Sequence, residues 1–215
     1  MNKLKLYDYF RSSASFRVRI ALELKNLDYQ LIPINLASPV GEQFSSDYQM
    51  INPQNFVPTL QDGDKTITQS LAIIEYLDDQ YPSSSVLSRN SYIKALIKAF
   101  ALTIIADIHP LNNLRVLNYL TNKLNVTDET KTEWYHHWII KGFAALEKQL
   151  HSINLYKEFC FGSHPTLADI CLVPQMYNAR RFNVDLSQYP TLVRIDKCCQ
   201  LHQAFINAWP EEKVT

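Results

Sequence analysis

Two adjacent serines, Ser12 and Ser13, lie between a short apolar segment and a helical run near the N-terminus. Residues 4–7 predict a strand and residues 15–25 predict a helix, so the serines fall at the start of that helix. The N-terminus of a helix offers unpaired backbone N–H groups and a partial positive charge. Hydroxyl groups in that environment favour an anion, including a thiolate. The first cysteine of the chain is Cys160, so we expect a ligand to supply any thiolate held here.

Two further segments carry residue types that could bind a peptide-like ligand. Proline cannot donate to a sheet ladder, so Pro58 near the start of a strand at 57–61 indicates an edge, a bulge or a cis bond. With a cis bond, the backbone of Val57 could pair with an extended ligand, whereas an ordinary trans turn proline is the more frequent case. Ser70, after Gln69, opens the next helix. Its hydroxyl could cap that helix, or it could bind a carboxylate together with the free N–H groups.

A polar cluster, HPLNNLR at 109–115, interrupts two apolar helical runs in the second half of the chain. We expect Pro110 to kink or break the chain there, which either aims side chains into a cleft or leaves solvated polar groups. His109 has no cysteine or histidine at ligand spacing, so we expect no metal site. The segment 166–169 fits a capping box with Asp169 in place of glutamate, and we interpret it as structural. We assign no role to the pair His136 and His137.

The elements that must position these residues divide the chain into two domains. The first 82 residues predict the order β-α-β-α-β-β-α, with strands at 4–7, 29–36, 57–61 and 66–68 and helices at 15–25, 44–50 and 70–81. Beyond residue 82 nearly every pattern is helical, with runs at 91–109, 112–124, 128–151, 167–178 and 190–208. We therefore predict an α/β domain at 1–82, a linker at 83–89 and an all-helical domain at 90–215.

The composition is typical of a soluble globular protein, with 47% apolar and 20% charged residues. Basic and acidic residues number 21 each, so no global field recruits nucleic acid or an anionic membrane. The N-terminus lacks the apolar core of a signal peptide, and no window has the length of a membrane span. The chain has four cysteines, Cys160, Cys171, Cys198 and Cys199, and they form no CxxC pair. We expect them to be reduced thiols in a cytoplasmic protein.

Together these motifs resemble the zeta class of the glutathione transferase family, the class of the maleylacetoacetate and maleylpyruvate isomerases. The most specific segment is SSASFRVRIAL at 12–22, which is similar to the zeta signature. NPQNFVPTL at 52–60 and QSLAIIEYL at 69–77 match the two other glutathione-site segments of the family. The cluster at 109–115 and ARRFNVDL at 179–186 resemble bacterial members. One departure is Ala14, where the eukaryotic signature has a cysteine, so a protein thiol at this position takes no part here.

The resemblance implies a thioredoxin-like N-terminal domain, an all-helical C-terminal domain, glutathione as cofactor and a homodimer. Ser13, with Ser12 as the second candidate, would donate a hydrogen bond to the glutathione sulfur. A charge-assisted hydrogen bond of about 1.5–3 kcal/mol lowers a thiol pKa by about one to two units. Val57 would pair with the cysteinyl backbone, Gln69 and Ser70 would hold the γ-glutamyl group, and Gln43 would reach the glycyl end. The resemblance also implies glutathione contacts from Ala14, Ser15, His109 and Asn113.

The implied reaction is the cis–trans isomerisation of maleylacetoacetate to fumarylacetoacetate in aromatic amino-acid breakdown, with maleylpyruvate as the alternative substrate. The thiolate adds to the cis double bond, the carbon–carbon axis rotates, and elimination returns glutathione. Basic residues would meet the carboxylate and the developing enolate of the substrate; the candidates are Arg11, His109, Arg115 and Arg181. For Arg17 and Arg19 we expect salt-bridged structural roles. Two other functions stay open: a transferase or dehalogenase acting on α-halo acids, and a non-enzymatic glutathione-binding interaction module.

Overall fold

The computed structural model describes residues 4–37 and 40–210, which pack into two compact units. The first unit combines Met1–Val86 with the stretch from His202 onward, and the second is Leu87–Leu201. The sequence did not indicate that the stretch from His202 joins the N-terminal unit, and the predicted boundaries at 82 and 90 stay predictions. Within the described part of the chain, none of the helices combines the length and apolarity that a membrane span needs.

The first unit is built on a four-stranded mixed sheet with the strand order β2-β1-β3-β4. The strands are β1 Leu4–Asp8, β2 Tyr29–Pro33, β3 Thr59–Asp62 and β4 Lys65–Thr68. β1 runs parallel to β2 and antiparallel to β3, and in this register Leu6 lies between Leu31 and Leu60. Leu6 and Leu60 are fully buried, as the alternation of apolar residues along these strands predicts.

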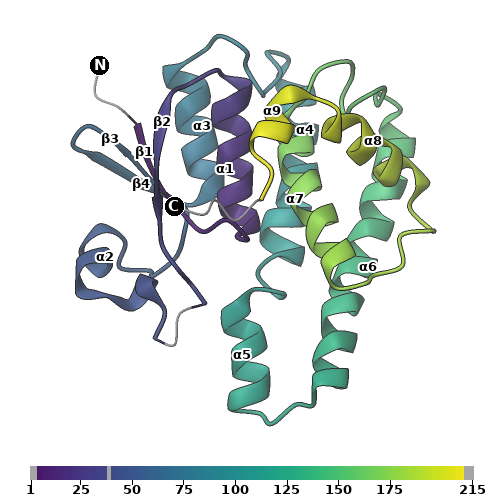
Figure 1. Ribbon diagram of the computed structural model, residues 1–215. Helices are drawn as coiled ribbons and strands as arrows, with labels where there is room; N and C mark the ends of the chain where they lie inside the picture. The colour runs from purple at the N-terminus through teal and green to yellow at the C-terminus, as the bar shows by residue number, and fades with distance from the viewer. Residues whose placement is uncertain (1–3, 38–39, 211–215) are drawn as a thin grey trace. The chain divides into compact units, whose positions relative to one another are not determined.

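Two helices, α1 Ser13–Leu24 and α3 Ser70–Gln80, lie side by side against one face of this sheet (Figure 1). Between β2 and β3 the chain forms a 3₁₀ turn, Glu42–Phe44, and the short helix α2 Ser46–Ile51. The helix α9 Gln203–Asn207 returns to α1, where the Phe16 and Trp209 rings meet edge to face at 5.6 Å. The predicted order β-α-β-α-β-β-α is confirmed, and the unit is thioredoxin-like.

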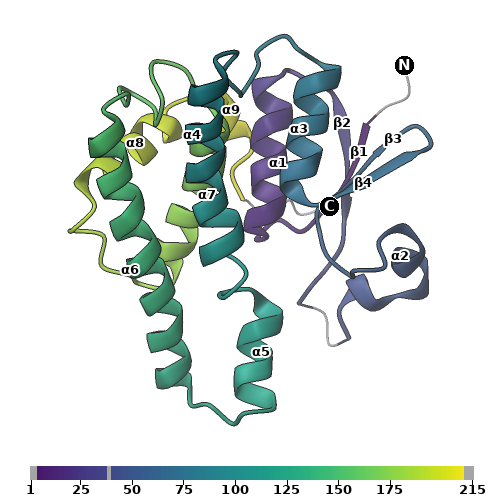
Figure 2. The same ribbon diagram turned by 180° about the vertical axis from the view of Figure 1, so that it is seen from behind.

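The second unit is entirely helical apart from its connections, which confirms the predicted fold class. Its helices are α4 Ser91–Leu102, α5 Leu114–Asn122, α6 Asp128–Ile153, α7 Leu167–Arg181 and α8 Pro190–Gln200. A π-helical segment, Thr103–Ile108, continues α4. α5 lies beside the N-terminal half of α6 (Figure 2). The prediction of one helix over 190–208 is wrong, because the chain breaks at residues 201–202 and His202 Nδ1 accepts a hydrogen bond from Ala204 N to cap α9.

The capping box at the start of α7 is confirmed. The Asp169 carboxylate accepts hydrogen bonds from the backbone N–H and the hydroxyl of Thr166, at 2.8 and 2.9 Å, and from Cys160 N at 2.8 Å. Desolvation of this fully buried group raises its pKa against the opposing effect of the hydrogen bonds. The box thus fixes a helix whose Ile170, Leu172 and Val173 are completely buried in the core of the unit.

Candidate functional site

The two serines at the start of α1 have different structural positions. Ser12 is the N-cap, and its Oγ accepts a hydrogen bond from Ser15 N at 3.2 Å. Ser13 is the first residue of the helix, two positions earlier than the sequence predicted, and is 6% exposed. Ser15 is completely buried, and its Oγ has no hydrogen-bond partner among the described residues. Because Ser13 is the first residue of the helix, the partial positive charge of the helix N-terminus acts directly on it.

The start of α3 differs from the prediction. Ser70 does not cap the helix; it is the first helical residue, and Gln69 occupies the N-cap position with a φ of 69°. The Gln69 side chain makes no capping hydrogen bond at this end, and its Nε2 donates to Gln54 Oε1 at 2.9 Å. The Oγ of Ser70 accepts a hydrogen bond from Arg17 Nη1 at 2.9 Å. α3 thus begins with an uncapped end beside a buried hydroxyl that a cation contacts.

The bond between Val57 and Pro58 is cis, one of the alternatives that the sequence left open. The segment before it is fixed from behind, since Phe56 O accepts hydrogen bonds from Tyr48 Oη at 2.7 Å and from Asn52 Nδ2 at 2.8 Å. Val57 itself precedes β3, and within residues 4–37 and 40–210 its backbone makes no hydrogen bond with another backbone group. Its N–H and C=O are therefore suited to pairing with an extended ligand.

Gln43 lies in the 3₁₀ turn before α2 and is 8% exposed. Its Oε1 is buried without a hydrogen-bond partner among the described residues. Gly41, with a φ of 76°, makes room for this side chain, because a Cβ at that position would lie 2.7 Å from Gln43 Nε2. A buried acceptor left unpaired is costly unless a ligand or water supplies the donor.

The arginines near the serine pair divide into buried and exposed groups. Arg19 forms a buried ion pair with Asp8 at 2.5 Å and donates to Phe10 O and Ala208 O, both at 3.0 Å, which confirms its predicted structural role. Arg17 is 1% exposed and donates to Ser70. Arg11 is exposed, and its guanidinium lies 5.0 Å from the centroid of the Phe10 ring.

In the helical unit, the predicted break near Pro110 is confirmed. The backbone N–H of His109 closes the π-helical segment on Ile104 O at 2.8 Å, and α5 then starts at Leu114. Asn113 caps α5, since its Oδ1 accepts from Arg115 N at 3.1 Å, and Arg115 is exposed. The turn is fixed to α6 through two hydrogen bonds, from Trp134 Nε1 to Leu111 O at 2.9 Å and from Asn112 Nδ2 to Tyr135 O at 3.0 Å.

Arg181 lies at the end of α7, in a segment that is held from several sides. Its guanidinium lies 5.1 Å from the centroid of the Phe182 ring, and that ring stacks on Tyr135 at 3.8 Å. A His136 ring nitrogen lies 2.7 Å from Phe182 O, a structural contact that helps to hold this end of the helix. Arg180 pairs with the fully buried Asp196 at 2.6 Å. Arg181 is itself exposed on this fixed end of the helix.

Comparison with known proteins places the chain in a family. The model for the glutathione S-transferase N-terminal domain matches residues 6–85. A probable maleylacetoacetate isomerase from Vibrio cholerae is 48% identical, over 99% of this chain and 98% of its own length. A zeta-class glutathione S-transferase from Euphorbia esula is 44% identical, over 98% of this chain and 92% of its own length.

The chain belongs to the zeta class of the glutathione transferases. Among solved structures, the holo form of a maleyl pyruvate isomerase, a bacterial zeta-class transferase, has a TM-score of 0.93 at 39% identity and 96% coverage of both chains. A maleylacetoacetate isomerase from Anaeromyxobacter dehalogenans with glutathione bound in its active site has a TM-score of 0.86 at 37% identity, over 99% of this chain and 97% of that one.

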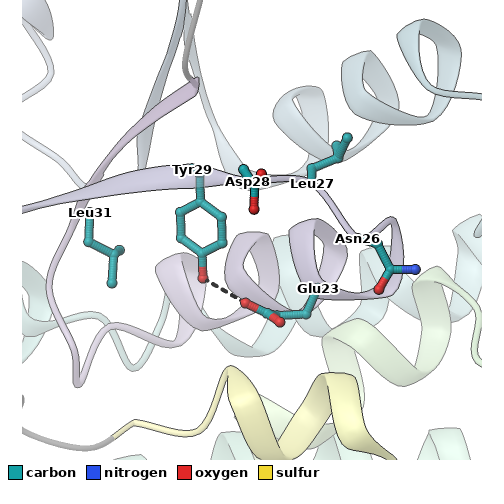
Figure 3. Close-up of a pocket in the computed structure, with 6 residues that line it drawn as sticks. All are labelled: Glu23, Asn26, Leu27, Asp28, Tyr29 and Leu31. Atoms are coloured by element: carbon teal, nitrogen blue, oxygen red, sulfur yellow. Dashed lines mark hydrogen bonds between the residues drawn. The ribbon is translucent and has the colours of Figure 1, made fainter.

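Not every depression in this transferase is suited to an acidic ligand. One shallow pocket lies at the C-terminal end of α1, the opposite end from Ser13 (Figure 3). The residues that line it are Glu23, Asn26, Leu27, Asp28, Tyr29 and Leu31. Tyr29 Oη donates to Glu23 Oε1 at 3.2 Å, and burial beside this carboxylate raises the pKa of Tyr29. Two carboxylates and no lining cation disfavour an anion here, and none of the predicted site residues belongs to this pocket.

The N-terminal unit holds most of the predicted glutathione residues at the ends of its elements. Ser12 and Ser13 lie at the start of α1, Ser70 lies at the start of α3, and Val57 lies just before β3. The hydrogen bond from Arg17 to Ser70 joins the first turns of α1 to the start of α3. The sequence did not predict the contact between Arg17 and the site, and the available signal was the position of Arg17 one turn into the signature helix.

Proposed function

We propose that the protein is a glutathione-dependent cis–trans isomerase that converts maleylacetoacetate to fumarylacetoacetate. The observation that carries this proposal is the position of Ser13, a buried hydroxyl on the first residue of α1, in a chain similar over its full length to maleylacetoacetate isomerases. Ser12 serves as the helix cap, which leaves Ser13 as the hydroxyl that meets the sulfur. Ala14 supplies no competing thiol.

The residues of the first unit fit glutathione. The buried and unpaired Oε1 of Gln43 needs a donor, which the glycyl amide of a tripeptide supplies. The backbone of Val57 offers a donor and an acceptor to the cysteinyl residue, as an added strand would use them. Gln69 and Ser70, at the uncapped start of α3, bind the γ-glutamyl carboxylate. We assign the further contacts to Ala14, Ser15, His109 and Asn113.

Glutathione supplies the nucleophile, a thiolate that adds reversibly to the conjugated double bond of the substrate. Ser13 donates its hydroxyl proton in a hydrogen bond to the sulfur and so favours the thiolate over the thiol. The N-terminus of α1 adds about 0.3–1 kcal/mol in the same direction. The exposed guanidinium groups of Arg11, Arg115 and Arg181, with His109, bind the substrate carboxylate and enolate oxygens.

Maleylpyruvate is a second candidate substrate. A maleyl pyruvate isomerase is among the similar solved structures, with a TM-score of 0.93 at 39% identity, which supports this candidate. Both acids carry the same cis double bond between carbonyl groups, so the residues assigned above serve either one.

We further propose a cytoplasmic homodimer. The described cysteines are all free thiols, as expected in a reducing compartment. Phe44 and Met50, on the segment that contains α2, are 52% and 81% exposed and offer apolar surface to a second copy.

Turnover of the two acids tests the proposal. Purified protein with a catalytic amount of glutathione is mixed with maleylacetoacetate or maleylpyruvate, and product is followed by ultraviolet absorbance coupled to a fumaryl hydrolase. We expect glutathione-dependent turnover, with kcat/KM deciding between the substrates. Turnover of neither acid together with rapid conjugation of an α-halo acid would establish a transferase or dehalogenase instead. Binding of glutathione with neither reaction would favour an interaction module.

A further inference from the structure

Arg17 is a buried cation that contacts the predicted glutathione site from inside the protein. It is 1% exposed and lies one turn into α1 from Ser13. Its Nη1 donates to the Oγ of Ser70 at 2.9 Å, across 53 positions of sequence. An arginine does not lose its proton under any ordinary condition, so a full positive charge stays beside this hydroxyl.

We propose that Arg17 is a positioning residue for recognition of the γ-glutamyl α-carboxylate of glutathione, acting through Ser70. This inference rests on the proposed function, in which Ser70 binds that carboxylate. Arg17 does not touch the ligand. It sets the direction in which the Ser70 hydroxyl donates, and its charge strengthens the attraction of the site for an anion.

The direction follows from the chemistry of a hydroxyl group. The Ser70 oxygen has one hydrogen to donate and two lone pairs that accept. The guanidinium of Arg17 occupies one lone pair, which turns the O–H away from Arg17 and makes it available as a donor to the ligand. Ser70 is 5% exposed, so a carboxylate that reaches it leaves most of its water behind. Charge-assisted hydrogen bonds are strongest in such a desolvated position.

The start of α3 is suited to the same anion. Gln69 holds a φ of 69° and provides no side-chain cap, so the first N–H groups of the helix keep their capacity for an anionic acceptor. The charge of Arg17 and the partial charge of the helix end act on one carboxylate. In the low-dielectric interior the charge of Arg17 is less screened by salt than that of an exposed arginine.

The test compares glutathione with 4-aminobutanoyl-cysteinyl-glycine, which is glutathione without the γ-glutamyl α-carboxylate. Calorimetry gives the Kd of both tripeptides for the wild type and for Arg17→Met. We expect Arg17→Met to weaken glutathione binding by about 10- to 100-fold and to leave the affinity for the analogue unchanged. The isomerase kcat at saturating glutathione should stay close to that of the wild type, while the KM for glutathione rises.

Arg19→Met is the matched control, because Arg19 lies on the same helix at 4% exposure and pairs with Asp8 instead. It should lower thermal stability without changing the ratio of the two Kd values. If Arg17→Met does not fold, Arg17→Lys takes its place. Lysine keeps the charge but loses the planar donor geometry and some reach. The Kd of the analogue divided by the Kd of glutathione should therefore fall by several fold.

Equal weakening of both tripeptides by the Arg17 variant would overturn the proposal, because it would show a general structural role. Unchanged Kd values for both tripeptides would overturn it as well. Failure of the proposed function has a different signature: without a glutathione site, wild-type protein would bind neither tripeptide, and without isomerase activity it would bind glutathione but convert neither acid.

Discussion

Replacing each of the two serines in turn separates the chemistry of the site from the folding of α1. Ser12→Ala removes the cap that Ser12 Oγ provides to Ser15 N. Loss of such a cap costs about 1 kcal/mol of stability, or about 2–4 °C in Tm for a chain of this size. Ser13 is the first residue of the helix and not its cap, so Ser13→Ala leaves that capping bond in place and should lower the Tm less than Ser12→Ala does.

The pKa of the bound glutathione thiol should respond in the opposite way, changing in Ser13→Ala and not in Ser12→Ala. A hydrogen bond from Ser13 to the thiolate is worth about 1.5–3 kcal/mol, and its loss raises the pKa of the bound thiol by about one to two units. At a pH below both values, the thiolate fraction and kcat/KM fall by about 10- to 100-fold in Ser13→Ala. The lost activity returns as the pH rises through the new pKa, because the thiol then ionises without help.

The ultraviolet absorbance of the thiolate, measured against pH with saturating glutathione, gives this pKa for the wild type and both variants. Thermal unfolding gives the two stabilities. Ser46→Ala, on an exposed serine in the first turn of α2, is a control that should change neither quantity. A raised thiol pKa in Ser12→Ala with an unchanged pKa in Ser13→Ala would refute the assignment and move the role to Ser12.

Two further predictions concern stability. In the N-terminal unit, burial alone would raise the pKa of Asp78, but hydrogen bonds from Lys25, Ser85 and Val86 N and the Lys25 charge at 2.8 Å lower it below its usual value. The pair therefore stabilises the fold above the unfolded-state pKa of an aspartate, about 3.9, and that stability is lost as the pH falls through the lower folded-state value. Asp78→Asn should cost about 3–5 kcal/mol at neutral pH and flatten the acid limb of stability measured by urea unfolding; an acid limb as steep as that of the wild type would contradict this. In the helical unit, a Cβ on Gly142 would lie 2.1 Å from Ile108 Cδ1, so Gly142→Ala should destabilise by about 1–3 kcal/mol despite the better helix propensity of alanine. Ile108→Ala in the same chain should recover part of that loss in thermal unfolding, and purely additive losses would show that the two residues do not compete for space.

Local patterns in the sequence predict the order of elements and the ends at which the site residues lie. Ser12 and Ser13 mark the start of α1 because a polar pair precedes an apolar run, although the helix begins earlier than that run indicates. The capping box of Thr166 and Asp169 is likewise read from adjacent residues. A proline at a strand start left the cis bond at Val57 as one of several alternatives, and only the structure selects it.

Contacts between distant segments decide what the sequence does not predict. Arg17 meets Ser70 because α1 and α3 pack together, and nothing local to either residue indicates that contact. Arg19 donates to Ala208 O across 189 positions, which helps to join the end of the chain to α1. The π-helical segment 103–108 has apolar residues that fit an ordinary helix, and its close approach to Gly142 on α6 appears only once both are folded.

The fate of glutathione during turnover tests the central claim most directly. Maleylacetoacetate is supplied in large excess over glutathione, and both the fumaryl product and the free thiol are measured at the end of the reaction. We expect many product molecules for each glutathione, with all of the glutathione recovered as the reduced and unmodified tripeptide. Consumption of one glutathione for each substrate molecule, or product formation that continues without glutathione, would contradict a glutathione-dependent isomerase.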